Sequence, residues 1–180
     1  EIKALNTDVI LVLGWYYMLP EKVRNLANYG AWGIHASMLP DYAGGAPLVW
    51  AIIEGQTETG VTLFKLDNGV DDGDIVAQLP ITIEEKDTIK EVYAKATESS
   101  KTMLGSALSD LSNVEFKPQD KSKIKVYPQR TPADGEIDWS WDSKRINDFI
   151  RAQTKPYPGA FTTINGKKVI LWDADIEDEG

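Results

Sequence analysis

The sequence predicts an α/β fold, followed by a small C-terminal appendage that contains β-structure. Apolar runs typical of strands buried in a sheet alternate with helix-forming segments up to about residue 111. Near the C-terminus, two β-rich segments flank Asn165-Gly166, the strongest short signal of a hairpin. With 180 residues and 42% hydrophobic residues, the chain is long enough to form one domain with an appendage.

In the first two thirds of the chain, helices and strands can be placed from the residues that begin and end them. We expect strands over residues 8–13, 31–35, 60–66 and 75–83, and helices over residues 21–29, 48–54 and 88–111. Pro20 and Pro47 suit the first turns of two helices, and Gly30 and Gly55 suit their ends. Residues 8–13 form a continuous apolar run, which predicts a strand buried on both faces of a parallel sheet.

The last third differs in composition. Residues 113–136 are rich in Lys, Pro and Asp, which predicts a linker. Asp142 or Ser143 can cap a short helix, and strands are expected on either side of Asn165-Gly166. We therefore predict three regions: a core over residues 1–112, a linker over residues 113–136, and an appendage with a helix and a hairpin over residues 137–180.

Composition excludes several classes of function. The chain has no cysteine and one histidine, which excludes disulfides and thiolate catalysis and argues against a zinc site. Its net charge of −9 argues against a long nucleic acid as partner. No apolar run approaches the roughly 18 residues of a membrane helix, and no signal peptide is visible. We expect a cytoplasmic protein that acts on small molecules.

Two loops carry the candidate chemistry. His35 ends the predicted strand 31–35, and Asp71 opens the loop Asp71-Asp72-Gly73-Asp74 after another apolar run. In open α/β sheets, functional groups gather beyond the carboxyl ends of strands, and histidine exchanges protons near neutral pH. The pair can therefore do acid–base chemistry. From the residues alone, a buried structural histidine and an ordinary turn aspartate remain open alternatives.

A set of motifs in these loops and beside them resembles the catalytic core of folate-dependent formyltransferases. The motifs are His35-Ala36-Ser37-Met38-Leu39-Pro40, Gly44-Gly45-Ala46-Pro47, Thr59-Gly60-Val61-Thr62 and Asp71-Asp72-Gly73-Asp74. The resemblance implies a Rossmann-like catalytic core, 10-formyltetrahydrofolate as co-substrate, and no metal. It begins in the middle of the family's catalytic domain, so we expect this chain to lack the first βα units and to form a homodimer through the open sheet edge.

Within that family, residues 45–53 and 158–161 resemble the sugar-amine N-formyltransferases, which are related to methionyl-tRNA formyltransferase. The resemblance and the acidic charge together predict formyl transfer to the amine of a nucleotide-linked amino sugar. Three alternatives stay open: formylation of methionyl-tRNA, folate-dependent hydrolysis, and a non-catalytic fragment that binds folate or a partner chain.

The resemblance also implies roles for single residues. His35 is expected to stabilise the oxyanion and transfer a proton, and Asp71 to handle protons and orient the histidine. The expected folate-binding residues are Tyr16, Tyr17, Met18, Leu19, Asp72 and Asp74. The expected substrate-binding residues are Ser37, Tyr42, Gly44 and Gly45.

Two positions depart from the family pattern. Gly33 stands where many members carry an Asn whose amide holds the formyl oxygen, and Ala43 stands where an Arg is usual. Loss of one oxyanion donor costs about 10²–10³ in rate unless a water or a backbone N–H replaces it.

Overall fold

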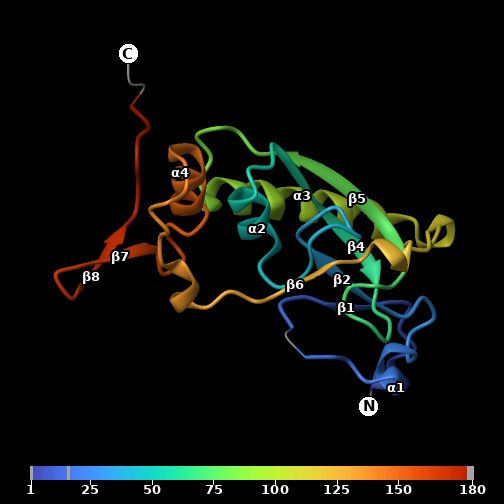
Figure 1. Cartoon of the computed structure of the whole chain (residues 1–180). Coiled ribbons are helices and arrows are strands. Elements are labelled where there is room, and N and C mark those ends of the chain that lie inside the picture. The colour runs from blue at the N-terminus through green and yellow to red at the C-terminus, as the bar shows by residue number, and fades with distance from the viewer. Residues whose placement is uncertain (1, 16, 178–180) are drawn as a thin grey trace.

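A four-stranded mixed sheet forms the centre of the computed structural model, which describes residues 2–15 and 17–177 (Figure 1). The strands are β1 (Ile10–Val12), β2 (Ala31–His35), β4 (Glu58–Lys65) and β5 (Ile75–Thr82), in the spatial order β1-β2-β4-β5. Within this sheet, β1 and β2 pair in parallel, whereas β4 pairs antiparallel with both β2 and β5. A loop without a crossover helix joins β4 to β5, and such a connection returns the chain antiparallel.

The first strand is less buried than its sequence predicts. β1 has three residues, and Leu11 within it and Leu13 just beyond it are exposed. The expectation that residues 8–13 are buried on both faces is wrong for the described residues. β1 lies at the edge of the sheet, where a strand has one neighbour instead of two, so fewer side chains pack against it.

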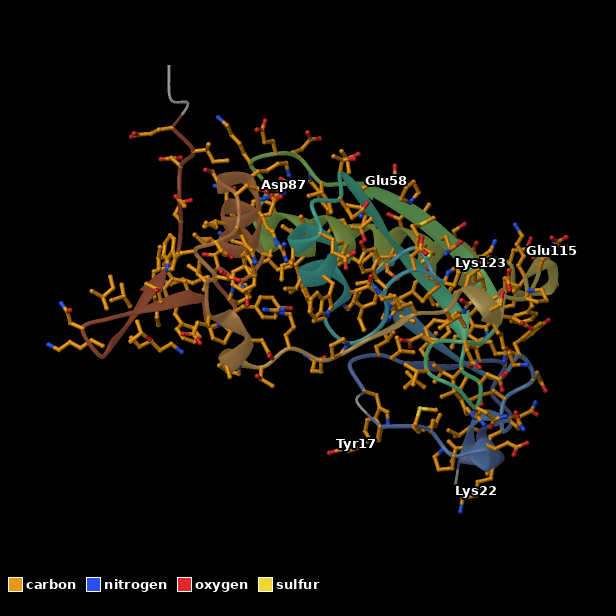
Figure 2. The ribbon with its side chains drawn as sticks, viewed as in Figure 1. Tyr17, Lys22, Glu58, Asp87, Glu115 and Lys123 are labelled. Carbon is orange, nitrogen blue, oxygen red and sulfur yellow. The ribbon has the colours of Figure 1, made fainter. Side chains whose placement is uncertain are left out.

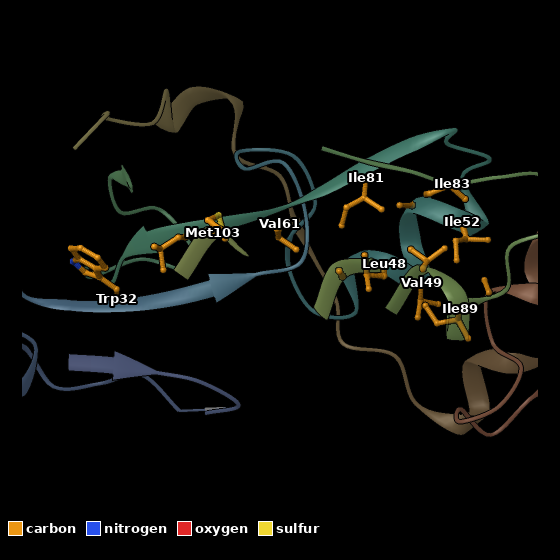
Figure 3. Close-up of a cluster of buried hydrophobic side chains, with 14 residues drawn as sticks. Trp32, Leu48, Val49, Ile52, Val61, Ile81, Ile83, Ile89 and Met103 are labelled. Carbon is orange, nitrogen blue, oxygen red and sulfur yellow. The ribbon is translucent and has the colours of Figure 1, made fainter. Parts of the chain in front are cut away.

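Two helices bury the main core against the sheet. α2 (Pro47–Ile53) and α3 (Ile89–Ser109) both contact β4, and α3 also packs along β5. Figure 3 shows their apolar side chains meeting those of the strands. The labelled residues of this cluster are Trp32, Leu48, Val49, Ile52, Val61, Ile81, Ile83, Ile89 and Met103. This core holds β2 in place, and β2 carries His35 at its end.

α1 (Glu21–Arg24) is shorter than the predicted helix over residues 21–29. The backbone N–H groups of Asn28 and Tyr29 donate to the carbonyls of Thr7 and Asp8, at 3.3 and 2.8 Å, instead of to the helix. These bonds join the turn after α1 to the segment before β1. Tertiary pairing thus replaces the last helical turn, which sequence periodicity cannot reveal.

α3 begins with a capping box. The Thr88 hydroxyl accepts from the Lys90 N–H at 3.2 Å, and the Thr88 N–H donates to Glu91 Oε2 at 3.0 Å. We expect Thr88→Ala to lower the free energy of unfolding by about 1 kcal/mol, because the Lys90 N–H loses its acceptor and the Glu91 carboxylate loses the hydroxyl that donates to it. Urea titration measures this change. Thr97→Ala, an exposed substitution within α3, is the control and should be neutral or slightly stabilising.

The segment after α3 runs back to the loop that follows β2. It contains three short 3₁₀ turns and β6 (Val126–Tyr127), which pairs in parallel with β3 (Ala43–Gly44). The turns are Leu111–Asn113, Lys121–Lys123 and Pro132–Gly135. Lys117 also pairs with Ile75 at the start of β5. The domain boundaries at residues 112 and 136 remain predictions.

The C-terminal region contains the expected helix and hairpin. α4 (Ser143–Arg151) is capped by the Asp142 carboxylate, which accepts from the Arg145 N–H at 2.8 Å. β7 (Ala160–Ile164) and β8 (Lys167–Leu171) form a hairpin that projects from the main body (Figure 1). Its turn residues have φ values of 51° at Asn165 and 73° at Gly166, as the Asn-Gly pair predicts. None of the described helices combines the length and apolar character needed to cross a bilayer.

Candidate active site

His35 and Asp71 meet beside the carboxyl end of β2. His35 Nδ1 lies 3.4 Å from Asp71 Oδ2, and the two side chains are 9% and 21% exposed. On the other side of the ring, His35 Nε2 lies 2.7 Å from the Tyr42 carbonyl oxygen. Because a carbonyl only accepts, Nε2 carries a proton in this arrangement. Nδ1 is therefore the nitrogen left to exchange a proton with Asp71 or a ligand.

Asp71 is held by its backbone as well as by its side chain. Its Oδ2 accepts from the Gly44 N–H at 2.8 Å, and its carbonyl accepts from Gln119 Nε2 at 2.8 Å. Its φ of 51° lies in the left-handed region, which Asp tolerates better than most residues. Gln119 also donates to the Gly73 carbonyl at 2.7 Å. The segment after α3 thus fixes the loop that presents this carboxylate to His35.

The loop between β2 and α2 is fastened to the neighbouring strands. The Thr62 hydroxyl of β4 donates to the Ser37 carbonyl at 2.7 Å and accepts from the Leu39 N–H at 3.1 Å. Gln78 of β5 donates to the Leu39 carbonyl at 2.8 Å. At the far end of the loop, the Tyr42 hydroxyl donates to Glu54 at 2.7 Å. Burial and this carboxylate raise the pKa of Tyr42, so its hydroxyl remains a donor.

A cleft of about 560 Å³ opens beside the His35–Asp71 pair. Seven of the predicted site residues line it: Tyr17, Met18, Leu19, His35, Gly44, Gly45 and Asp71. Val12, Phe64 and Leu66 provide apolar walls. Tyr17 extends from the loop before α1 and is 77% exposed (Figure 2). The volume and the mixed lining are typical of a small-molecule site.

The other predicted site residues do not line this cleft. Ser37, Tyr42, Asp72 and Asp74 lie outside its lining, and Tyr16 lies outside the described residues. Ser37 is fully buried and donates to the Asp41 carbonyl at 2.5 Å. Asp72 pairs with Lys121 at 2.9 Å, and Asp74 lines a second, polar cavity of about 170 Å³. Their binding roles remain predictions.

The sequence reasoning missed two residues near the site, Arg24 and Gln119. Arg24 is buried and lines the cleft, although it belongs to the short helix α1. The sequence carries no usable signal for its burial, because α1 ends at Arg24 and an arginine in a short helix is ordinarily solvated. Gln119 carries no signal either, since it lies in an irregular segment far along the chain from Asp71.

The two departures from the family pattern have different surroundings. Gly33 lines the cleft, and a Cβ added there would lie 3.0 Å from Leu66 Cδ2 and 3.4 Å from Phe64 Cε1. Ala43 is fully buried in an apolar cluster with Leu39 and Phe64. A guanidinium at position 43 would lose water without gaining an acceptor from those side chains. Ala43 therefore suits this packing, and a side chain at position 33 would press against Leu66 and Phe64 in the wall of the cleft.

The sequence matches two family descriptions that together include both parts of the chain. Residues 1–108 match the description "Formyl transferase", and residues 130–180 match "Formyl transferase, C-terminal domain". The chain belongs to the formyl transferase family. Membership confirms both the expected family and the expected α/β fold class with its C-terminal appendage. The formyl transferase match also places His35 and Asp71 in the N-terminal family region.

Three proteins show how this family member relates to others. It is 38% identical over 178 residues to the methionyl-tRNA formyltransferase of Caldanaerobacter subterraneus subsp. tengcongensis, covering 98% of this chain and 57% of that protein. The chain thus spans little more than half of that relative. HypX from Aquifex aeolicus in complex with tetrahydrofolic acid matches with a TM-score of 0.79 and 25% identity, over 96% of this chain and 30% of HypX.

The third is a solved N-formyltransferase from Helicobacter canadensis in complex with folinic acid and dTDP-3-aminofucose. It matches with a TM-score of 0.74 and 22% identity, over 89% of this chain and 60% of that chain. At this identity the likeness concerns the fold alone. The expected sugar acceptor is therefore not confirmed, and the relative with the higher identity is a methionyl-tRNA formyltransferase.

Proposed function

We propose that this protein transfers a formyl group from 10-formyltetrahydrofolate to an amine in the cleft beside His35 and Asp71. The observation that carries the proposal is the pair itself, with Nδ1 and Oδ2 3.4 Å apart at the wall of a cleft of small-molecule size. Membership of the formyl transferase family supports the reaction class. The HypX complex with tetrahydrofolic acid supports the choice of donor.

The reaction needs a negative charge to be stabilised and a proton to be moved. The amine nitrogen attacks the formyl carbon, a new C–N bond forms, and the bond from that carbon to N10 breaks. The amine loses a proton and N10 gains one. Because Nε2 is engaged by the Tyr42 carbonyl, His35 acts through Nδ1, which Asp71 faces. Asp71 fixes the ring and stabilises its protonated form during the transfer.

The cleft also has the surfaces that a folate needs. Two pairs of side chains offer apolar contact to a flat heterocycle. Met18 and Leu19 lie on the loop before α1, whereas Phe64 lies on β4 and Leu66 lies just after it. Gly44 and Gly45 bring backbone close to the cleft, and side chains there would clash with Tyr127 and Gln129. These residues fit the heterocyclic part of the donor next to the acid–base pair.

Two acceptors are supported by different observations. The 38% identical relative favours methionyl-tRNA. The net charge of −9 favours a nucleotide-linked amino sugar, because a polyanionic tRNA is attracted by basic surfaces. Rates with each acceptor, measured at two salt concentrations, separate them. A tRNA acceptor predicts a steep loss of affinity with added salt, whereas a nucleotide sugar predicts a shallow one.

The first test is calorimetric titration of the whole chain with 5-formyltetrahydrofolate, a stable form of the donor. We expect saturable binding with one site per chain. The control ligand is p-aminobenzoylglutamate, which carries the tail without the pterin and should bind far more weakly. If a chain with a cooperative thermal transition gives no binding heat over several temperatures, the proposed function is wrong.

A further inference from the structure

Tyr42 is attached to its surroundings at both ends. Its carbonyl oxygen lies 2.7 Å from His35 Nε2, and its hydroxyl donates to Glu54 Oε2 at 2.7 Å. Its φ of 55° lies in the left-handed region, which is rare for a bulky residue because Cβ crowds the following carbonyl. A residue keeps such a backbone only where the surrounding structure holds it there. The contacts of the Tyr42 side chain therefore help to fix the position of its carbonyl.

Glu54 is the group that holds the Tyr42 side chain. It directly follows α2, and its carboxylate accepts from two phenols, that of Tyr42 at 2.7 Å and that of Tyr127 at 3.1 Å. The two rings lie against each other, with their centroids 4.9 Å apart. Tyr127 belongs to β6, which pairs with β3 directly after Tyr42. One carboxylate at the end of α2 thus fastens the loop after β2 to the segment after α3.

The neutral ring of His35 faces two acceptors but carries one proton. The Tyr42 carbonyl faces Nε2 at 2.7 Å, and Asp71 Oδ2 faces Nδ1 at 3.4 Å. The carboxylate is the stronger acceptor, since hydrogen bonds to charged groups exceed those to neutral groups. Of the two, only the carbonyl lies at an ordinary hydrogen-bond distance, and this keeps the proton on Nε2. A small withdrawal of Tyr42 would let the ring donate from Nδ1 to Asp71 instead.

The position of this proton matters for chemistry in the cleft. His35 lines the cleft, whereas Tyr42 and Glu54 lie outside its lining. Nδ1 can take a proton from an attacking amine only when it carries none itself. The hydrogen bond made by one ring nitrogen determines the state of the other. A contact made outside the cleft therefore controls the nitrogen that exchanges protons inside it.

We propose that Glu54 is a positioning residue for His35. Through the hydroxyl and the backbone of Tyr42, it keeps the imidazole proton on Nε2 and leaves Nδ1 bare beside Asp71. The use of Nδ1 in formyl transfer rests on the proposed function, whereas the position of the proton does not. Because the Glu54 side chain is exposed, its removal should disturb the ring of His35 with little effect on global stability.

The test is the ring spectrum of His35, which is the single histidine of the chain, after labelling with isotope-enriched histidine. Long-range proton–nitrogen spectra of the neutral ring report which nitrogen carries the proton. We expect the Nε2–H form in the wild type, and a mixture with the Nδ1–H form in Tyr42→Phe and Glu54→Ala. Glu54→Gln keeps an oxygen that accepts from the Tyr42 hydroxyl, so it should restore the wild-type spectrum.

Turnover and thermal unfolding separate positioning from a purely structural role. Tyr42→Phe and Glu54→Ala should lower kcat about tenfold with the KM for the donor unchanged, because a misplaced base slows the reaction without weakening binding. Their melting temperatures should stay close to that of the wild type. The matched controls are Tyr93→Phe on α3 and Glu58→Ala at the start of β4, which remove an exposed phenol and an exposed carboxylate (Figure 2). They should change neither the ring spectrum nor kcat.

The possible outcomes distinguish this inference from the proposed function. An Nδ1–H ring in the wild type, or a wild-type ring spectrum in both Tyr42→Phe and Glu54→Ala, overturns the positioning role. A Glu54→Gln spectrum that matches that of Glu54→Ala also overturns it, because the hydrogen bond to Tyr42 would then not be the link. If the proton moves as expected in a chain that neither binds 5-formyltetrahydrofolate nor transfers formyl groups, the positioning of the ring is upheld and the proposed function is wrong.

Discussion

His35→Gln is expected to lower the rate of formyl transfer by about 10²–10⁴-fold, which is the usual contribution of a positioned acid–base group. The glutamine amide can still donate to the Tyr42 carbonyl, so the loop after β2 keeps its main anchor to this side chain. What the variant loses is a group that takes up and releases a proton beside Asp71. Steady-state turnover with 10-formyltetrahydrofolate and the preferred acceptor measures the effect.

Asp71→Asn provides the companion variant. Asparagine tolerates the left-handed backbone and keeps an oxygen that can accept from the Gly44 N–H. It removes the negative charge that faces His35 Nδ1, so turnover should fall while the melting temperature changes little. Because the two residues act as one unit, the double variant should be no slower than about the slower single variant. If the losses of turnover in the two single variants multiply in the double variant, the two residues act independently and the proposed pairing is wrong. Near-normal turnover in both single variants would contradict a catalytic role for either residue.

Local signals in the sequence predicted those parts of the fold that local forces decide. The capping residue Asp142, the Pro47 start of α2 and the Asn165-Gly166 turn each act within a few residues, and all three elements form as expected. Predictions failed where distant contacts decide. α1 ends early because Asn28 and Tyr29 pair with the chain before β1. Strand direction is equally hard to predict from local sequence, because it depends on how the connections between strands cross the sheet.

In the candidate site, too, local motifs predicted some residues, and contacts between distant segments determine the others. His35 and Asp71 belong to two loop motifs, and the structure brings their side chains together. The Gly44 N–H that holds Asp71 also belongs to a motif, whereas the amide of Gln119, which holds the Asp71 carbonyl, comes from a segment with no motif of its own. Arg24 was missed because an arginine in a short helix is ordinarily solvated. Only its tertiary surroundings reveal that it is buried with unpaired donors.

Gly73→Ala is expected to destabilise the protein by about 3 kcal/mol or more. A Cβ at this position would overlap the carbonyl oxygen of Lys65, which belongs to β4, so a strand of the central sheet or the loop must move. The Lys65 N–H donates to the Asp74 carbonyl at 2.8 Å, and this bond would be strained as well. Urea titration and thermal unfolding measure the loss.

Gly105→Ala is the matched control for this substitution. Gly105 lies near the C-terminal end of α3, and an added Cβ there meets no atom within 4 Å. Alanine in an exposed helical position should stabilise the protein by about 0.5–1 kcal/mol. Equal effects at the two glycines would show that the close approach of Gly73 to Lys65 is absent in solution. Because Asp71 lies two residues before Gly73, loss of turnover should accompany loss of stability in Gly73→Ala. In Asp71→Asn, turnover should fall alone, and this contrast separates the position of the carboxylate from its charge.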